Sequence, residues 1–307
     1  MKFKRYLITL VLISAMFFIA EFFNQKEIIF PEILALSTGA WIANKQPWMT
    51  NKRKIFLLFL LCSLMGICTV RYIQAPLIVQ VSICFFFTGL VLTLTKTSLI
   101  PIISACILPV YFQTTTWIYP ISVTTMAAII IAVQWWFEKS RLRPQNHYIP
   151  CDFDLKKEFF KWLKMWAILA TIALIPFSSH HFYFVAPPLI VTFVEFSNTK
   201  SKLRKKPLKV FFVLTGAAFI GMLLRLFLNL FLHLPLTICA ILACIFLFII
   251  FEKRQLLFPP AGAILLLPMI LNVNNLYFYP IEVAFGSIIF ISLGILAFKA
   301  KSSLEMQ

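Results

Sequence analysis

Long apolar runs alternate with short polar loops along the whole chain. A helix needs about 20 apolar residues to cross a bilayer. Twelve runs reach or approach that length, at residues 6–23, 28–43, 55–72, 76–94, 99–113, 117–137, 162–178, 182–196, 208–231, 234–251, 256–271 and 277–298. The pattern predicts an all-α polytopic membrane protein with about 12 transmembrane helices, some of them short.

The basic residues test whether the short runs, notably 28–43, 99–113 and 182–196, also cross. Lysines and arginines cluster at 45–54, 96, 139–143, 200–209, 253–254, and at Lys299 and Lys301. Cytoplasmic loops carry an excess of such residues, so these clusters should share one side. If all twelve runs cross the membrane, every one of these clusters falls on the same side. If any one short run does not cross, the later clusters fall on the opposite side. We therefore expect a plasma-membrane protein with both termini cytoplasmic, the first run being an uncleaved helix rather than a signal peptide.

Composition and charge support the same class. The chain is 61% hydrophobic with 34 Phe in 307 residues, more apolar surface than a soluble domain can bury. The net charge of +17 lies in the short loops, where it indicates topology and contact with anionic lipid. We therefore expect the lipid bilayer as a partner and no nucleic acid; the sequence leaves a homo-oligomer open.

Cysteine and histidine do not form a recognisable chemical site. Six of the seven cysteines lie within apolar runs, as small core residues do. The adjacent His180 and His181 have no Cys, Asp or Glu nearby to complete a metal set. No pairing of a nucleophile with a base stands out either. We expect no metal, no cofactor and no enzymatic activity.

The chain divides into two similar halves: a membrane repeat at 1–138, a cytoplasmic linker at 139–161, a second membrane repeat at 162–301 and a tail at 302–307. Three sets of residues correspond between the halves: Gly66 with Gly221, Pro101 and Pro109 with Pro260 and Pro268, and Tyr119 with Tyr279. Each half has an even number of predicted helices. The halves should therefore be parallel six-helix pseudo-repeats about an axis along the membrane normal.

Residues 258–263, Phe-Pro-Pro-Ala-Gly-Ala, resemble the signature of the HPP family of integral membrane proteins, named for His-Pro-Pro. The similarity covers about residues 187–299, and a fainter copy covers 31–139. The histidine of the motif is Phe258 here. The family is thought to contain transporters, with nitrite transport implied for some members, so the resemblance implies a tandem duplication of a transporter-like unit.

The double proline is also the first candidate binding site. A helix N-terminus attracts anions, so Pro259, Pro260, Ala261 and Gly262, with Arg254 nearby, are candidates to hold a small anion. Small residues and prolines are equally typical of tight helix packing.

Charged residues inside apolar runs are the second set of candidates. Counting residues from the basic loops places four of them near the outer surface: Arg71, Arg225, Glu32 and Glu282. They would line an outer vestibule, couple transport to protons, or form a structural layer of ion pairs. Snorkelling to the interface is an alternative interpretation of the two arginines. Glu195 precedes a basic loop and should form an interfacial ion pair.

These features favour a transporter or channel-like permease for a small solute, most of all an inorganic anion such as nitrite. An exporter of organic, aromatic acids is an alternative, although such proteins carry larger soluble regions than this chain. A non-transporting membrane scaffold is a third interpretation that the sequence leaves open.

Overall fold

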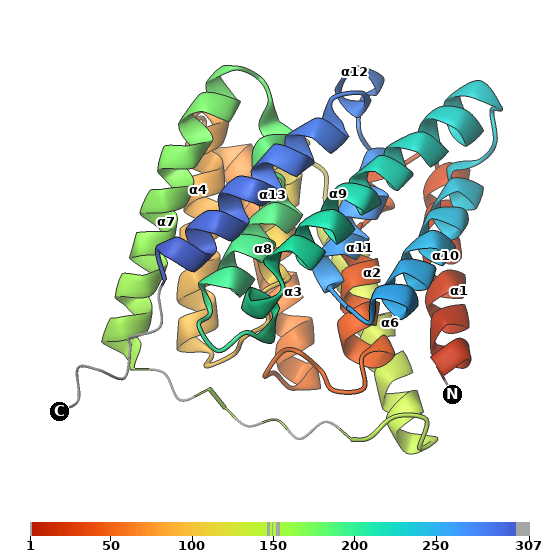
Figure 1. The fold of residues 1–307 in the computed structure, drawn as a ribbon, viewed down its shortest axis with the longest axis horizontal. Helices are drawn as coiled ribbons and strands as arrows, with labels where there is room; N and C mark the ends of the chain where they lie inside the picture. The colour runs from red at the N-terminus through yellow and green to blue at the C-terminus, as the bar shows by residue number, and fades with distance from the viewer. Residues whose placement is uncertain (1, 146–147, 149, 152–153, 299–307) are drawn as a thin grey trace.

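The computed structural model describes residues 2–145, 148, 150–151 and 154–298, and all regular secondary structure in these residues is helical (Figure 1). Lys299, Lys301 and the tail at 302–307 lie outside the described residues. The expected all-α class is confirmed for the described part of the chain.

Eight helices within the described residues are long and apolar enough to cross a membrane. They are α1 (Lys2–Phe22), α3 (Lys52–Tyr72), α4 (Leu77–Leu94), α6 (Ile118–Lys139), α7 (Leu155–Ser178), α9 (Pro207–Leu224) with its π-helical extension η5 (Arg225–Phe231), α10 (Leu236–Arg254) and α13 (Tyr279–Leu296). Their outward surfaces expose large apolar side chains such as Phe18, Phe212 and Phe246. Lipid solvates such a surface and water does not, so the chain is a helical membrane protein.

The other four apolar runs form short helices. These are α2 (Glu32–Ser37) with η2 (Thr38–Ile42), α5 (Ile102–Tyr111), α8 (Pro187–Ser197), and α11 (Pro259–Leu266) with η6 (Leu267–Met269). Prolines stand at or just before the start of each, where a missing N–H is tolerated. Nearly every residue of these helices is buried. They form the interior of the bundle, where α2 packs on α11 and α5 packs on α8.

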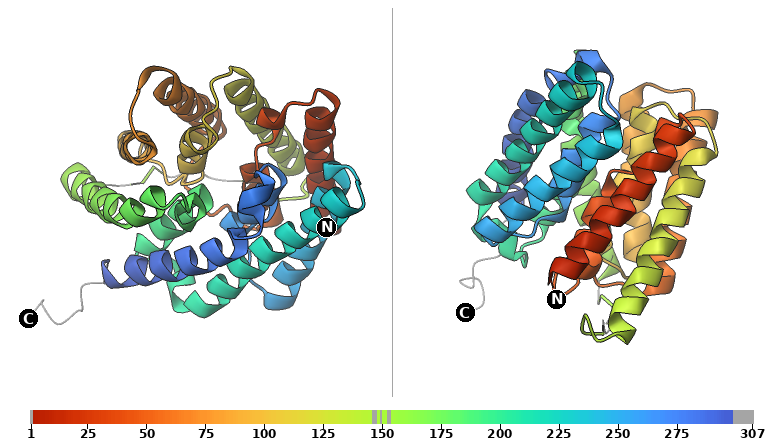
Figure 2. Two further views of the ribbon diagram at one scale, coloured as in Figure 1. Left: turned by 90° about the horizontal axis from the view of Figure 1, so that it is seen from above. Right: turned by 90° about the vertical axis from the view of Figure 1, so that its right-hand side faces the viewer.

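Short one-turn elements join these helices: η1 (Lys26–Ile28), η3 (Phe182–Val185), η4 (Lys202–Lys205) and α12 (Val273–Leu276). Seen from above, residues of the first half lie on one side and those of the second half on the other (Figure 2). Contacts between the halves involve α1 with α10 and α4 with α7, in addition to the short helices.

One end of the bundle carries the basic loops, and we call it the basic face; it is the lower end in Figure 1. Hydrogen bonds tie its loops together. The Ser98 N–H donates to the Met49 carbonyl oxygen (3.2 Å), and the Met49 N–H donates to the Ser98 hydroxyl (2.8 Å). The Cys151 N–H donates to the Lys96 carbonyl oxygen (3.1 Å). The positive charge of the described loops is thus concentrated at one end.

In each half a proline removes the backbone N–H that would donate to the carbonyl four residues earlier, and a tyrosine hydroxyl donates to that carbonyl instead. Pro109 within α5 has no N–H to donate to the Ala105 carbonyl, four residues earlier. The Tyr119 hydroxyl donates to this oxygen instead (2.9 Å). In the second half Pro268 bears the same relation to the Ile264 carbonyl, which accepts from the hydroxyl of Tyr279 (2.8 Å).

The seventh helix begins earlier than the apolar run at 162–178. The Asp154 carboxylate accepts hydrogen bonds from the N–H groups of Lys156 (3.2 Å) and Lys157 (3.4 Å), which starts α7 at Leu155. The preceding helix, α6, continues to Lys139. Charged residues can therefore extend a helix beyond the apolar run at the basic face.

Candidate functional site

A cavity of about 540 Å³ lies between the four short helices and opens on the basic face. Its deep part contains Glu32 at the start of α2 and Ser104 on α5, both buried. Its mouth carries the exposed lysines Lys45, Lys200 and Lys202. The cavity thus combines a positively charged entrance with a buried carboxylate.

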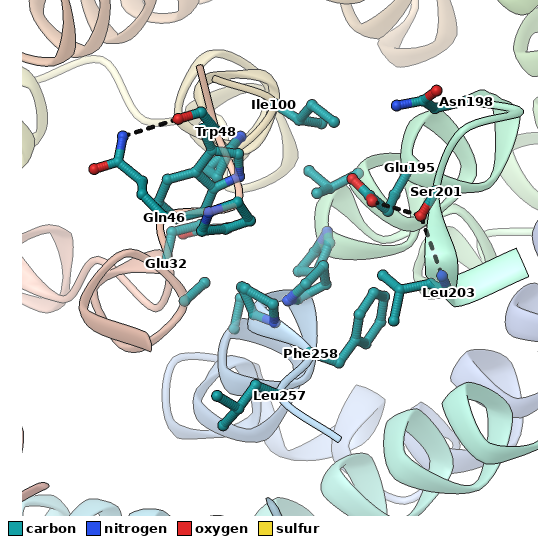
Figure 3. Close-up of a pocket in the computed structure, with 18 of the residues that line it drawn as sticks. Glu32, Gln46, Trp48, Ile100, Glu195, Asn198, Ser201, Leu203, Leu257 and Phe258 are labelled. Carbon is teal, nitrogen blue, oxygen red and sulfur yellow. Dashed lines mark hydrogen bonds between the residues drawn. The ribbon is translucent and has the colours of Figure 1, made fainter. Parts of the chain in front are cut away.

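The side walls of the cavity are largely apolar, as Figure 3 shows. Trp48 lies over η2, close enough that a Cβ atom at Gly39 would be 2.3 Å from its ring. The Trp48 backbone carbonyl accepts a hydrogen bond from the Gln46 side chain (3.0 Å), which helps to fix this turn. On another side, Leu257 and Phe258 precede α11 and also face the cavity.

Pro259 and Pro260, two of the candidates for an anion site, line the cavity. Neither has an N–H group, and the next N–H, of Ala261, donates to the Phe258 carbonyl oxygen (3.1 Å). The start of α11 therefore offers an anion no free N–H from its first three residues. The double proline shapes the wall, and the positive charge at the cavity comes from lysine side chains.

Ala261 and Gly262 are buried and do not line the cavity. A Cβ atom at Gly262 would be 2.7 Å from Leu34 Cγ on α2. The absence of a side chain at Gly262 thus permits the close contact of α2 with α11. Arg254, at the end of α10, is exposed and does not line the cavity either.

Glu32 is 2% exposed, and neither carboxylate oxygen has a hydrogen-bond partner among the described residues. The Ser104 hydroxyl, which also faces the cavity, likewise has no partner within that part of the chain. Buried polar atoms are normally paired, so unpaired ones facing a cavity mark a place for a ligand, a water or a proton.

Glu195 lines the same cavity from α8. Its carboxylate accepts a hydrogen bond from the Ser201 hydroxyl (2.9 Å), as Figure 3 shows. The sequence predicted an interfacial ion pair for this residue. Within the described residues the structure has no ion pair at Glu195, because the neighbouring Lys200 and Lys202 extend toward solvent.

Two of the four predicted outer charges are buried away from this cavity. Arg225 donates a hydrogen bond to the carbonyl oxygen of Pro268 in η6, just after α11. Glu282 accepts from the Tyr183 N–H (2.8 Å), and one of its oxygens lies 3.0 Å from His181 Nδ1. Arg225 and Glu282 therefore do not pair with each other, and each makes hydrogen bonds to a neighbouring segment.

Arg71 is exposed at the end opposite the basic face, where it donates to the Thr115 carbonyl oxygen (3.3 Å) and lies 5.0 Å from the Trp117 ring centre. In the described part of the chain, therefore, Arg71, Arg225, Glu32 and Glu282 form no common layer of ion pairs. Glu32 alone of these four lines the cavity, because α2 starts below the surface.

The sequence pattern marks the mouth lysines only as topology signals and gives no indication that Trp48 lies at a cavity. Their position at the cavity depends on the fold, which brings the loops at 43–51 and 198–206 to the same cavity. A lysine in a basic loop has the same sequence pattern whether it faces a cavity or not.

No known protein-family model, curated protein or solved structure matches this chain. The composition, the exposed apolar surface and the eight long helices of the described residues define its class as a helical multi-pass membrane protein.

Proposed function

We propose that the protein is a membrane permease for a small inorganic anion, with nitrite as the first substrate to test. The observation that carries this proposal is the central cavity, which opens between short helices and has Lys45, Lys200 and Lys202 at its mouth. Secondary transporters commonly build their sites from short or broken helices inside a bundle. Exposed lysines at an entrance raise the local concentration of anions.

The proposal includes the membrane arrangement. All twelve apolar segments, including the four short ones, would cross the membrane, with the basic face and both termini cytoplasmic in the plasma membrane. The halves would be parallel pseudo-repeats, as the paired contacts Tyr119–Ala105 and Tyr279–Ile264 support. The proposed HPP relationship rests on the Pro259–Pro260 motif in the second half.

An organic acid is a second candidate substrate. The cavity volume of about 540 Å³ falls within the usual range of small-molecule pockets and exceeds what nitrite needs. Trp48 and Phe258 give the walls aromatic surface. An aromatic carboxylate would place its charge toward the lysines and its ring against these walls.

Flux into proteoliposomes tests the proposal. We expect saturable uptake of nitrite or nitrate that falls in a Lys200→Gln/Lys202→Gln variant. The matched control is Lys205→Gln/Lys209→Gln, which removes the same charge from exposed positions that do not line the cavity. No saturable flux of any anion with well-folded protein, or equal loss in both variants, would contradict the proposal.

Competition identifies the substrate class. An aromatic carboxylate should inhibit nitrite uptake weakly if the site is built for inorganic anions and strongly if it is built for organic acids. A scaffold protein without a solute site would show neither flux nor thermal stabilisation by these anions.

A further inference from the structure

We propose that Glu32 is a proton-binding site in the cavity and that its proton moves together with the transported anion. The coupling of the proton to the anion rests on the proposed function. The protonation of Glu32 does not, because it depends only on the surroundings of this carboxyl group in the cavity.

The surroundings of Glu32 lack what an ionised carboxylate needs. Its two oxygens are buried and make no hydrogen bond within the described part of the chain; the nearest donors are the Ser104 hydroxyl and the N–H group of Glu32 itself. Ser104 brings the only hydroxyl beside it in the cavity lining, and one neutral hydroxyl can serve one oxygen at most. An uncompensated charge in such a place is strongly unfavourable, and a bound proton neutralises it.

The elements packed around α2 do not supply the missing donors. Tyr119 of α6 and Tyr279 of α13 lie near Glu32, but their hydroxyls donate to the carbonyls of Ala105 and Ile264. Cys106 of α5 is a buried, weakly polar thiol, and α11 has no ionisable side chain.

The charged groups of α1, which also packs on α2, lie at its two ends, where Lys4 is exposed and the other three have partners. Arg5 donates to Asn44 (3.1 Å) and to the Leu142 carbonyl oxygen (2.5 Å), Lys2 pairs with Glu252 (3.2 Å), and Glu21 binds the start of α10. In the cavity itself, the charged groups besides Glu32 are Glu195, Lys45, Lys200 and Lys202, of which the lysines extend toward solvent.

Coupling follows from the charge of the substrate. An anion that reaches the deep part of the cavity meets Glu32, and an ionised Glu32 would repel it, because two negative charges in a poorly screened site repel each other. The proton that a Glu32 oxygen has bound from the solution on the entry side removes this repulsion. One proton and one monovalent anion then enter together, and both are released on the far side. The step is electroneutral and forms no bond to the substrate.

Infrared spectroscopy of the purified protein tests the protonated carboxyl group without any substrate. We expect the carbonyl stretch of a protonated carboxyl at neutral pH in the wild type and its loss in Glu32→Gln. The control Glu21→Gln should keep the band, because Glu21 accepts from the Thr237 N–H (3.1 Å) and hydroxyl (2.5 Å) and is far from the cavity. A band that survives unchanged in Glu32→Gln would overturn the inference.

Proteoliposomes with a pH gradient test the coupling. Nitrate is the better probe here, because neutral nitrous acid leaks through lipid. We expect an acid exterior to drive nitrate accumulation in the wild type. In Glu32→Gln that accumulation should fall to the level of protein-free vesicles, and Glu32→Asp, which keeps a titratable carboxyl group, should retain part of it.

The outcomes separate the two proposals. Gradient-driven accumulation that survives in Glu32→Gln overturns the coupling and leaves the proposed function standing. Loss of the infrared band without anion flux in the wild type supports the proton site and contradicts the proposed function. Thermal melting of each variant shows whether a loss of flux arises from unfolding.

Discussion

A Cβ atom placed on Gly221 would lie 2.3 Å from the carbonyl oxygen of Leu265, so α9 meets the backbone of α11 at this point. The first half has the same relationship, with a Cβ on Gly66 lying 2.3 Å from the Cys106 carbonyl oxygen on α5. In both halves, therefore, a long helix presses a glycine against the short helix that borders the cavity. A backbone carbonyl cannot rotate away from a new methyl group, whereas the end of a flexible side chain can.

Gly221→Ala should destabilise the protein by about 1–3 kcal/mol, because the new methyl group has to displace the backbone of α11. Gly216→Ala on the same helix is the matched control, since a Cβ there meets no atom within 4 Å. It should be neutral or stabilise by roughly 0.5–1 kcal/mol, as alanine favours the helix. Thermal unfolding in detergent measures both. Equal melting temperatures for the two variants would contradict the close contact.

Arg225→Ala should lower the thermal stability more than Arg71→Ala does. Arg225 is buried, and its loss leaves the Pro268 carbonyl without its donor, at about 1–3 kcal/mol. Arg71 is exposed, and its bond to Thr115 competes with water, so its loss should cost about 0–1 kcal/mol. If Arg71→Ala were the more harmful change, Arg71 would have a role beyond this surface contact.

Asp154 predicts a small acid dependence of stability. The Lys157 side chain (3.0 Å) and the N–H groups of Lys157 and Lys156 hold the pKa of this carboxyl below its usual value. The folded state therefore binds the proton more weakly than the unfolded state. The stabilisation is present above the unfolded pKa of about 3.9 and is lost as pH falls through the lower folded pKa.

Asp154→Asn isolates this effect, because asparagine also caps a helix but does not titrate. Melting temperature measured from pH 6 down to pH 3 should fall more steeply for the wild type than for the variant. Parallel curves would show that Asp154 does not contribute to the acid dependence.

The class and most helices could be predicted from the sequence, because apolar length determines where a chain can cross lipid. The double proline likewise predicts the start of α11. The depth of Glu32 could not be predicted, because counting residues gives the correct depth only if the run at 28–43 starts at the surface. In the structure the chain before α2 turns inward through η1, and α2 starts beside α5. The hydrogen-bond partners of Arg225 and Glu282 depend on which helices pack together. The pattern of apolar and polar residues along the chain does not predict this packing.

The pairs Tyr119–Pro109 and Tyr279–Pro268 permit a test of whether each tyrosine hydroxyl replaces the backbone hydrogen bond that the proline removes. Tyr119→Phe removes the donor to a buried carbonyl, Ala105, and should cost about 1–3 kcal/mol. The exposed Tyr72 provides the control, since Tyr72→Phe should change stability by less than about 0.5 kcal/mol.

Pro109→Ala gives α5 the N–H that proline lacks, aimed at the same Ala105 carbonyl oxygen. In that background Tyr119→Phe should cost less than in the wild type, because the carbonyl now has a donor within its own helix. The two changes should therefore be non-additive by at least about 0.5 kcal/mol in melting experiments. The cycle of Tyr279→Phe with Pro268→Ala should give an interaction energy of the same sign, since the Ile264 carbonyl also accepts from a tyrosine hydroxyl. Additive effects in both cycles would mean that the tyrosines stabilise the bundle by packing and not by replacing the missing backbone hydrogen bond.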